Sequence, residues 1–264
     1  MSVGKSLKDR VQSLDRACDI LQCLADQGPA LGVSEIAGTL GLSKSTVHRL
    51  LIALETQRLV RQVSAGRKYQ LGIRLFELGL KAVDEQGLVT SARPRLTSLV
   101  TATGETAHLG VLREGEVVSV CAVESPRTLR TPSTVGRRTP AHSSSLGKAI
   151  LAFAPEEDVH FVAAARGLAR FTPTTLCDPE ALSEELALIR RRGYAIDNEE
   201  FEEGLKCIGA PVWDATGAVT AAVSIAGPAK RLNKDAMPRL IGHVRETAFG
   251  LSADLGYGGE MTGT

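Results

Sequence analysis

The 264-residue sequence lacks the features that mark several large classes of protein. No apolar run approaches the roughly 20 residues that a membrane-spanning helix needs, and the N-terminus has basic residues without the apolar segment of a secretory signal. The five cysteines and five histidines are scattered, without a CxxC pair, which argues against a disulfide framework and a zinc site. We therefore expect a cytoplasmic protein with reduced thiols, no bound metal and no cofactor.

The motifs of several common enzyme classes are missing as well, because no G-x-S-x-G, G-x-G-x-x-G or HExxH occurs. One short match is present: Ser145 and Lys148 fit the S-x-x-K pattern, which places a serine and a lysine one helical turn apart. Its companion elements S-D-N and K-T-G are absent, and Ala149 stands where a phosphate-binding P-loop needs Ser or Thr. We predict that the protein is not an enzyme, with a serine/lysine hydrolase as the alternative.

The charge is divided unevenly along the chain, although the formal net charge is only +1. Residues 1–81 carry a net charge of +5, and residues 82–264 carry a net charge of −4. The length and the 43% hydrophobic content are sufficient for two domains with buried cores. A basic N-terminal part joined to an acidic body is typical of a DNA-binding module attached to a second domain.

Two short helices around a glycine turn are predicted between Val33 and Gln57. Ser34 and Ser43 each precede a helical run, where a side-chain oxygen can accept a hydrogen bond from an orphan amide. Gly41 lies between the two runs, where the chain needs a left-handed turn. The pattern predicts a helix-turn-helix. Taken alone, the segment would favour an ordinary solvated amphipathic helix pair, and the hairpin and charge division shift the balance to a DNA-binding motif.

The second helix has one apolar face and one polar face at about 100° per residue. A polar face of this composition suits a helix in the major groove of double-stranded DNA. Arg49 is predicted to read a guanine edge, since a guanidinium can bond it bidentately, and Lys44 to contact phosphate. The residues of this segment predicted to contact DNA are Ser43, Lys44, Ser45, Thr46, His48 and Arg49.

A basic hairpin is predicted after the helix pair, with alternating runs at 59–62 and 68–71 and Gly66 at a loop position of positive φ. Arg61, Arg67 and Lys68 would lie along the phosphate backbone. Apolar spacing from Leu14 to Leu24 predicts a further helix ahead of the pair. Residues 12–73 are thus predicted to form a winged helix-turn-helix domain, preceded by a flexible tail at residues 1–11.

A linker helix is predicted within residues 74–90, because Ile73–Ala82 is apolar on more than one helical face. Such a helix needs something to cover it. A second copy of the chain would serve, giving a homodimer, and packing against the chain's own C-terminal domain is the alternative.

Residues 91–258 are predicted to form a mixed domain of helices and strands, with a tail at residues 259–264. Strands grouped at both ends, with helices between, indicate an α+β fold around an antiparallel sheet. The predicted helices are Pro94–Thr103, Leu146–Phe153, Pro155–Ala165, one from Asp178 to Arg192 and a last one capped by Asn233; the predicted strands are Ala107–Leu112, Val117–Val123, Tyr194–Asp197, Ile208–Trp213 and Ala218–Ala226.

Three segments of this domain are candidates for lining a ligand pocket. The first is the hydroxyl-rich run 142–148, which enters a helix whose free amides suit a carboxylate. The second is the acidic run 197–207, and the third is 224–227 at the end of the last strand. Each also has a purely structural explanation, as helix caps, a solvated loop and a turn respectively.

Several motifs occur in one order along the chain, and with them it resembles the IclR family of bacterial transcription regulators from about Leu14 to Tyr257. The resemblance implies a winged-helix domain, a linker helix used in dimerisation, and a GAF-like C-terminal domain that binds a small metabolite, often a carboxylate or aromatic acid. It also implies a repressor of a metabolic or catabolic operon whose dimers pair into tetramers. The motifs are S-L-D-R-A-C-D-I-L at Ser13–Leu21, S-E-I-A-G-T-L-G-L-S-K-S-T-V-H-R-L-L at Ser34–Leu51, Y-Q-L-G at Tyr69–Gly72, the His142–Lys148 loop, R-R-R-G-Y-A-I-D-N-E-E at Arg190–Glu200 and G-L-K-C-I-G-A-P-V at Gly204–Val212.

The resemblance also implies which residues contact the effector. Two of these positions depart from the family pattern: Ser145 adds a hydroxyl where relatives often have Gly or a small apolar residue, and Ala226 replaces a second serine that grips a carboxylate in some relatives. The effector is therefore expected to differ from the small keto acids bound by those relatives, and a DNA-binding protein without an effector remains the alternative. The implied contacts are Ser145, Leu146, Asp197, Leu205, Cys207, Ser224 and Ala226.

Overall fold

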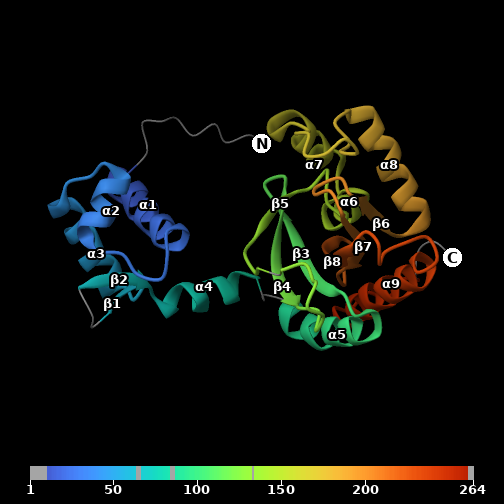
Figure 1. The fold of residues 1–264 in the computed structure, drawn as a ribbon, viewed down its shortest axis with the longest axis horizontal. Coiled ribbons are helices and arrows are strands. Elements are labelled where there is room, and N and C mark those ends of the chain that lie inside the picture. The colour runs from blue at the N-terminus through green and yellow to red at the C-terminus, as the bar shows by residue number, and fades with distance from the viewer. Residues whose placement is uncertain (1–10, 64–66, 84–86, 133, 261–264) are drawn as a thin grey trace. The chain divides into compact units, whose positions relative to one another are not determined.

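The computed structural model describes residues 11–63, 67–83, 87–132 and 134–260 and separates the chain into two compact units, residues 1–83 and 84–264 (Figure 1). The core of the N-terminal unit lies among its first three helices, where Ile20, Ile36, Val47 and Leu51 are fully buried. The described elements of this unit are α1 (Gln12–Asp26), α2 (Val33–Leu40), α3 (Lys44–Thr56), β1 (Val60–Val63), β2 (Lys68–Leu71) and α4 (Ile73–Val83).

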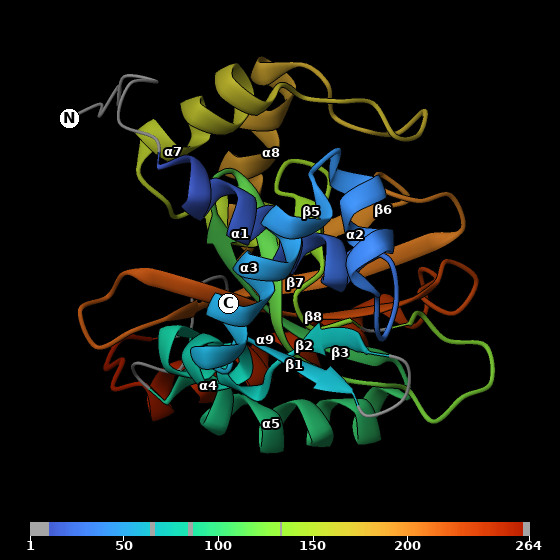
Figure 2. The same cartoon turned by 90° about the vertical axis from the view of Figure 1, so that its left-hand side faces the viewer.

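The arrangement is a winged helix-turn-helix, as predicted (Figure 2). β1 and β2 form an antiparallel hairpin in which Val60 pairs with Leu71 and Val63 with Lys68. A backbone bridge between Leu31 and Tyr69 ties the chain before α2 to the hairpin. The predicted glycine position of the hairpin loop, Gly66, lies outside the described residues.

Two of the predicted helix-end residues are confirmed. Gly41 has φ 64°, the left-handed conformation expected in the turn between α2 and α3. Ser43 precedes α3, and its Oγ accepts a hydrogen bond from the Thr46 amide at 3.2 Å.

The prediction that Ser34 caps α2 is wrong. The helix begins at Val33, the residue before Ser34, so Ser34 lies inside its first turn. Gly32 is the capping residue, and its amide donates to Oε2 of Glu35 at 2.5 Å. A glutamate three residues into the helix thus supplies the acceptor that we assigned to a serine.

The C-terminal unit is built around an antiparallel sheet, which confirms the predicted α+β class. Among the described residues the sheet has the strand order β5-β4-β3-β8-β7-β6, with every neighbouring pair antiparallel. Its strands are β3 (Thr106–Arg113), β4 (Glu116–Val123), β5 (Arg138–Pro140), β6 (Ala195–Asn198), β7 (Leu205–Trp213) and β8 (Val219–Pro228).

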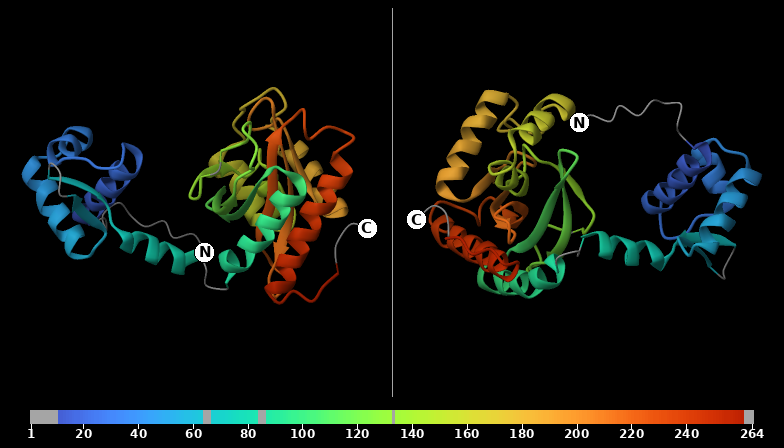
Figure 3. Two further views of the ribbon diagram at one scale, coloured as in Figure 1. Left: turned by 60° about the horizontal axis from the view of Figure 1, so that its bottom comes forward. Right: turned by 180° about the vertical axis from the view of Figure 1, so that it is seen from behind.

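Helices cover both faces of this sheet (Figures 1 and 3). The long helices α5 and α9 pack against each other on one face, and α6 packs against β7 and β8 on the other, with α8 beyond it. Gly209 on β7 permits the close approach of α6, because a Cβ there would lie 2.6 Å from the Ser145 carbonyl oxygen. The helices are α5 (Leu88–Thr103), α6 (Ser145–Leu151), α7 (Glu156–Phe161), followed by a π-helical turn at Val162–Arg166, α8 (Pro179–Arg192) and α9 (Met237–Asp254).

Helix α5 starts earlier than predicted and contains Pro94 in its interior. Leu88, Ala92, Leu96 and Leu99 all lie buried on one face, so apolar burial continues across the proline and offsets the hydrogen bond that it cannot donate. The predicted linker of residues 74–90 therefore contains all of α4 except Ile73, together with the first residues of α5, and is divided between two helices.

Two further differences concern the strands and the last helix. β5 was not predicted, because a three-residue strand is too short to give an alternating pattern. Asn233 does not cap α9, which begins at Met237; its Oδ1 accepts the amides of Asp235 and Ala236 in the turn before the helix.

Candidate DNA-binding surface and ligand pocket

The exposed face of α3 carries the residues predicted to read DNA. Lys44, Ser45, His48 and Arg49 are exposed, whereas the opposite face of the helix is buried in the core. The predicted contacts Ser43 and Thr46 are already used locally, since their hydroxyl oxygens lie 2.9 Å apart at the helix start. Ser45 Oγ also lies 3.0 Å from Ser43 Oγ, so the exposed side chains of this face without such a local bond among the described residues are Lys44, His48 and Arg49.

The hairpin carries the three predicted cations, with different surroundings. Arg61 is exposed on β1 opposite Gln70, and Arg67 is exposed with φ 53°. Lys68 lies with its Nζ 3.5 Å from Oε2 of Glu35, so part of its charge is balanced within the chain. Arg61 and Arg67 are thus more available to phosphate than Lys68.

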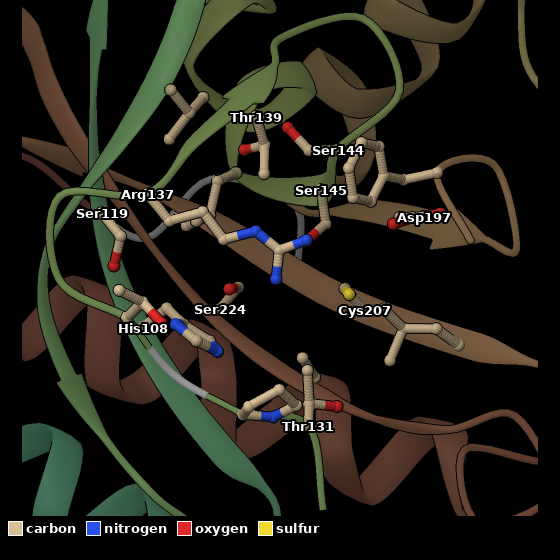
Figure 4. Close-up of a pocket in the computed structure, with 17 residues that line it drawn as sticks. His108, Ser119, Thr131, Arg137, Thr139, Ser144, Ser145, Asp197, Cys207 and Ser224 are labelled. Atoms are coloured by element: carbon tan, nitrogen blue, oxygen red, sulfur yellow. The ribbon is translucent and has the colours of Figure 1, made fainter. Parts of the chain in front are cut away.

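A cavity of about 90 Å³ lies between α6 and the sheet in the C-terminal unit (Figure 4). This volume is several times the roughly 10–15 Å³ that one buried water requires, so the cavity has room for a small organic molecule. All seven residues expected to contact an effector line it, namely Ser145, Leu146, Asp197, Leu205, Cys207, Ser224 and Ala226.

The strand register explains how residues far apart in sequence meet at this cavity. Asp197 on β6 pairs with Cys207 on β7, which pairs with Ala226 on β8. In the next row across the sheet, Ser224 pairs with His108 on β3. Because side chains two residues apart on a strand share a face, both rows point toward α6.

Two hydroxyls in the cavity wall have no hydrogen-bond partner among the described residues: those of Ser145, which is 1% exposed, and Ser119, which is 8% exposed. A buried polar group without a partner costs about 1–3 kcal/mol. A polar ligand would relieve this cost, whereas an apolar one would not.

The ionisable groups of the wall have shifted pKa values. Burial raises the pKa of Asp197 to about 7. The hydrogen bond that its Oδ1 accepts from the Glu200 amide at 2.8 Å acts in the opposite direction and lowers the pKa. Burial, helped by the nearby Arg137 cation, lowers the pKa of His108 to about 4. The pKa of Cys207 is well above its usual range because of burial and the facing Asp197 carboxylate. At neutral pH the histidine and the thiol are therefore uncharged.

Lys148, the lysine of the S-x-x-K match, is not available as a base. Its Nζ lies 2.5 and 2.7 Å from the two carboxylate oxygens of Glu200 and donates to the Ile196 carbonyl at 2.7 Å. Its amine is directed to three acceptors of the chain and not to the Ser145 hydroxyl, so it is not positioned to activate Ser145. The hydrolase alternative lacks its general base.

In the part of the chain that the structure describes, no group of three or more His, Cys, Asp and Glu side chains could hold a metal ion. None of the described helices is long and apolar enough to cross a membrane.

Models of two domain families match the chain: the IclR helix-turn-helix domain over residues 13–64, and the bacterial transcriptional regulator IclR C-terminal domain over residues 80–253. The chain belongs to the IclR family. It is therefore a DNA-binding transcriptional regulator with an effector-binding C-terminal domain, and not an enzyme.

Individual relatives match nearly the whole chain. The HTH-type transcriptional regulator KdgR of Dickeya chrysanthemi is 37% identical, with 94% of this chain and 81% of that protein covered. The HTH-type transcriptional repressor AllR of Salmonella typhimurium is 36% identical over 93% of this chain and 90% of its own. A crystal structure of an IclR homologue from Microbacterium hydrocarbonoxydans, complexed with 4-hydroxybenzoate, has a TM-score of 0.82 at 29% identity and covers 92% of this chain and 98% of that one.

Several polar residues of the cavity wall were not predicted from the sequence. They come from β3, β4, β5 and the segment before β5, which carry no hydroxyl-rich or acidic run to draw attention. The one available signal was the charge of Arg137 in a segment without helical or strand periodicity. The unpredicted polar residues are His108, Ser119, Thr131, Thr134, Arg137 and Thr139, whereas Ser144, which also lines the cavity, lies within the predicted run 142–148.

Proposed function

We propose that the protein is a cytoplasmic repressor of a metabolic or catabolic operon, controlled by a small carboxylate or aromatic acid bound in the cavity. The observation that carries this proposal is the cavity wall, where two buried hydroxyls lack partners among the described residues. The name of AllR, a repressor, supports the sign of regulation, and the 4-hydroxybenzoate complex of the Microbacterium homologue supports an acid as ligand.

Operator binding is assigned to α3 and the hairpin. Arg49 is proposed to read a base edge, while Lys44, Arg61 and Arg67 contact phosphate. A dimer would present two such units, and we infer that α4 joins them, because Ile73, Phe76 and Leu78 are 66%, 64% and 46% exposed in the single chain. Dimers would then be joined into tetramers through the C-terminal units.

The control is a linkage between two binding sites. An acid that binds one arrangement of the C-terminal units more tightly than another shifts the population toward it, and α4 would pass this to the spacing of the two α3 helices. Operator affinity then changes by the coupling free energy, typically about 1–3 kcal/mol.

A DNA titration tests the proposed reading helix. With DNA flanking the protein's own gene as the specific site, Arg49→Ala should weaken specific binding by about 1–3 kcal/mol and leave random DNA nearly unaffected. Lys44→Ala is the matched control, and it should weaken both DNAs alike and reduce the salt slope by about one. Equal losses of Arg49→Ala on specific and random DNA would contradict the assignment to base reading.

A thermal-shift screen tests the effector. Acids that bind only the folded state stabilise it by about 2.7 kcal/mol at a concentration of 100 times Kd. We expect aromatic or aliphatic acids to raise the melting temperature and to change operator affinity. If no acid in a broad collection does either, the protein is a DNA-binding protein without an acid effector, which is the alternative function.

A further inference from the structure

Neighbouring arginines, Arg137 and Arg138, direct their side chains to different places. Successive side chains alternate across a strand, and here Arg137 and Thr139 line the cavity whereas Arg138 does not. Figure 4 shows the Arg137 guanidinium extending into the space bounded by Ser145, Ser224 and Cys207. The chain therefore places one cation inside the cavity and its neighbour outside.

The backbone fixes the position of Arg137. Its carbonyl oxygen accepts the Ser119 amide at 3.0 Å, and the Gly136 amide donates to the Ser119 carbonyl at 2.7 Å, so the segment continues the ladder between β5 and β4. The guanidinium carbon lies 5.7 Å from the centre of the Phe201 ring, a cation–π distance. The Arg137 backbone is thus held beside Ser119, whose hydroxyl has no partner among the described residues, and the guanidinium extends from there toward Phe201 and Ser145.

The two arginines also differ in their counter-charges. Arg138 pairs with Glu116, Nε to Oε2 at 2.9 Å, and with Glu114 at 3.4 Å. For Arg137, no ion pair with a carboxylate is present among the described residues. A guanidinium without a carboxylate, next to buried hydroxyls, is ready to form charge-assisted, bidentate bonds to an anion.

The rest of the wall limits the charge and shape of that anion. Asp197 lines the same cavity from β6 and has a pKa of about 7, so its ionised form would repel a second negative charge on the ligand and its protonated form would offer no counter-charge. One guanidinium balances one carboxylate, whereas a phosphate monoester would bring close to two negative charges. His108, buried on β3, adds no positive charge near neutral pH.

We propose that Arg137 is the anchor and specificity-determining residue of this cavity, pairing with the carboxylate of a monocarboxylic acid while Ser119 and Ser145 bond its remaining polar atoms. This inference rests on the proposed function, because it names the chemical class of the effector. It adds a residue that lies outside the set implied by the family resemblance.

The test compares the full-length protein with Arg137→Met and the matched control Arg138→Met. Both variants lose one positive charge from adjacent exposed positions, but only the first loses it from the cavity. Each protein is screened by thermal shift, then titrated calorimetrically, with monocarboxylic acids, their neutral carboxamides and the corresponding phosphate monoesters; 4-hydroxybenzoate and 4-hydroxybenzamide form one pair. The melting temperature without ligand checks that both variants fold.

We expect at least one acid to bind the wild type more tightly than its carboxamide and its phosphate ester. Arg137→Met should weaken that acid roughly 10- to 100-fold, as expected for one charge-assisted pair, and should not weaken the carboxamide. Arg138→Met should bind both as the wild type does. Acid binding that survives Arg137→Met, or equal binding of acid and carboxamide by the wild type, would overturn the role of Arg137 as the anchor. Either result would leave the proposal of an effector intact. Tighter binding of the phosphate ester would overturn the monocarboxylate class. No binding of any acid by the wild type would overturn the proposed acid effector itself.

Discussion

Two groups of buried polar side chains lie next to each other in the C-terminal unit, and they differ in whether the chain itself provides their hydrogen-bond partners. Lys148 and Glu200, 1% and 6% exposed, satisfy each other with bonds of 2.5 and 2.7 Å. Ser145, three residues before Lys148, is equally buried, yet its hydroxyl has no partner among the described residues. One helical turn of α6 thus carries a group that the chain completes and a group open to the cavity.

This difference explains how the pocket can have a polar wall and still be rigid. The completed pair holds α6 to β6 and the turn after it, since Lys148 also bonds the Ile196 carbonyl. The open hydroxyl then stays in a fixed place, so a ligand need not spend binding free energy on ordering it. The comparison predicts that changes in the pair act on stability, and that changes in the open groups act on ligand binding.

The largest effect is expected from Lys148→Met. Removing one partner leaves the Glu200 carboxylate buried without its counter-charge, which typically costs about 3–5 kcal/mol. Urea unfolding followed by circular dichroism measures the loss. The double variant Lys148→Met with Glu200→Leu should recover a large part of it, because no buried charge remains. A single variant as stable as the wild type would show that the pair does not hold α6.

A smaller effect is expected from pH, through Asp197. Its pKa of about 7 in the folded chain lies above the ordinary value of 3.8, so the folded state holds a proton that the unfolded state has released. Its contribution to stability is therefore greatest at low pH and falls as the pH rises from about 4 to about 7, by up to about 1.4 kcal/mol per pH unit. Asp197→Asn should flatten this slope.

The control for the pH experiment is Asp214, a half-buried carboxylate in the turn before β8. Its pKa is lowered, chiefly by the Thr216 hydroxyl, so its contribution is lost only as the pH falls. Asp214→Asn should leave the slope between pH 4 and 7 unchanged. If Asp197→Asn also leaves it unchanged, the Asp197 carboxyl is ionised in the folded protein near neutral pH.

The smallest change in stability is expected from Ser145→Ala: no protein hydrogen bond is lost, and removal of the unpartnered hydroxyl should raise stability by about 1 kcal/mol. Ligand binding should nevertheless weaken, roughly 3- to 10-fold for one neutral hydrogen bond. Ser143→Ala is the matched control: its hydroxyl is also buried and without a partner among the described residues, but it does not line the cavity. Equal effects of the two variants on ligand binding would remove Ser145 from the binding site.

The sequence predicted local features well where short-range chemistry determines them. The Ser43 cap, the left-handed Gly41 and the apolar stripe of α3 all depend on residues within four positions of each other. The prediction that Ser34 caps α2 failed because the helix starts at Val33, which places Ser34 inside the first turn and lets Glu35 accept the Gly32 amide.

The cavity was predicted only in part: the candidate segments 142–148, 197–207 and 224–227 each contribute to its wall, and the individual contacts were implied by the family resemblance. Its wall depends on strand register, which places His108 beside Ser224 although 116 positions separate them. Arg137 could not be predicted, since it precedes a strand of three residues whose pairing with β4 is a long-range contact. No local pattern tells which of Arg137 and Arg138 faces inward.

Ligand binding in the cavity and operator binding by the N-terminal unit are proposed to be coupled, so that each changes the free energy of the other. This coupling is tested most directly by titrating an acid found in the thermal-shift screen into the protein, with and without saturating operator DNA. Linkage requires that the operator change the acid affinity by the same factor by which the acid changes the operator affinity, about 5- to 150-fold for typical coupling. Matching factors are the predicted result. An acid that binds equally tightly with and without operator would contradict the claim.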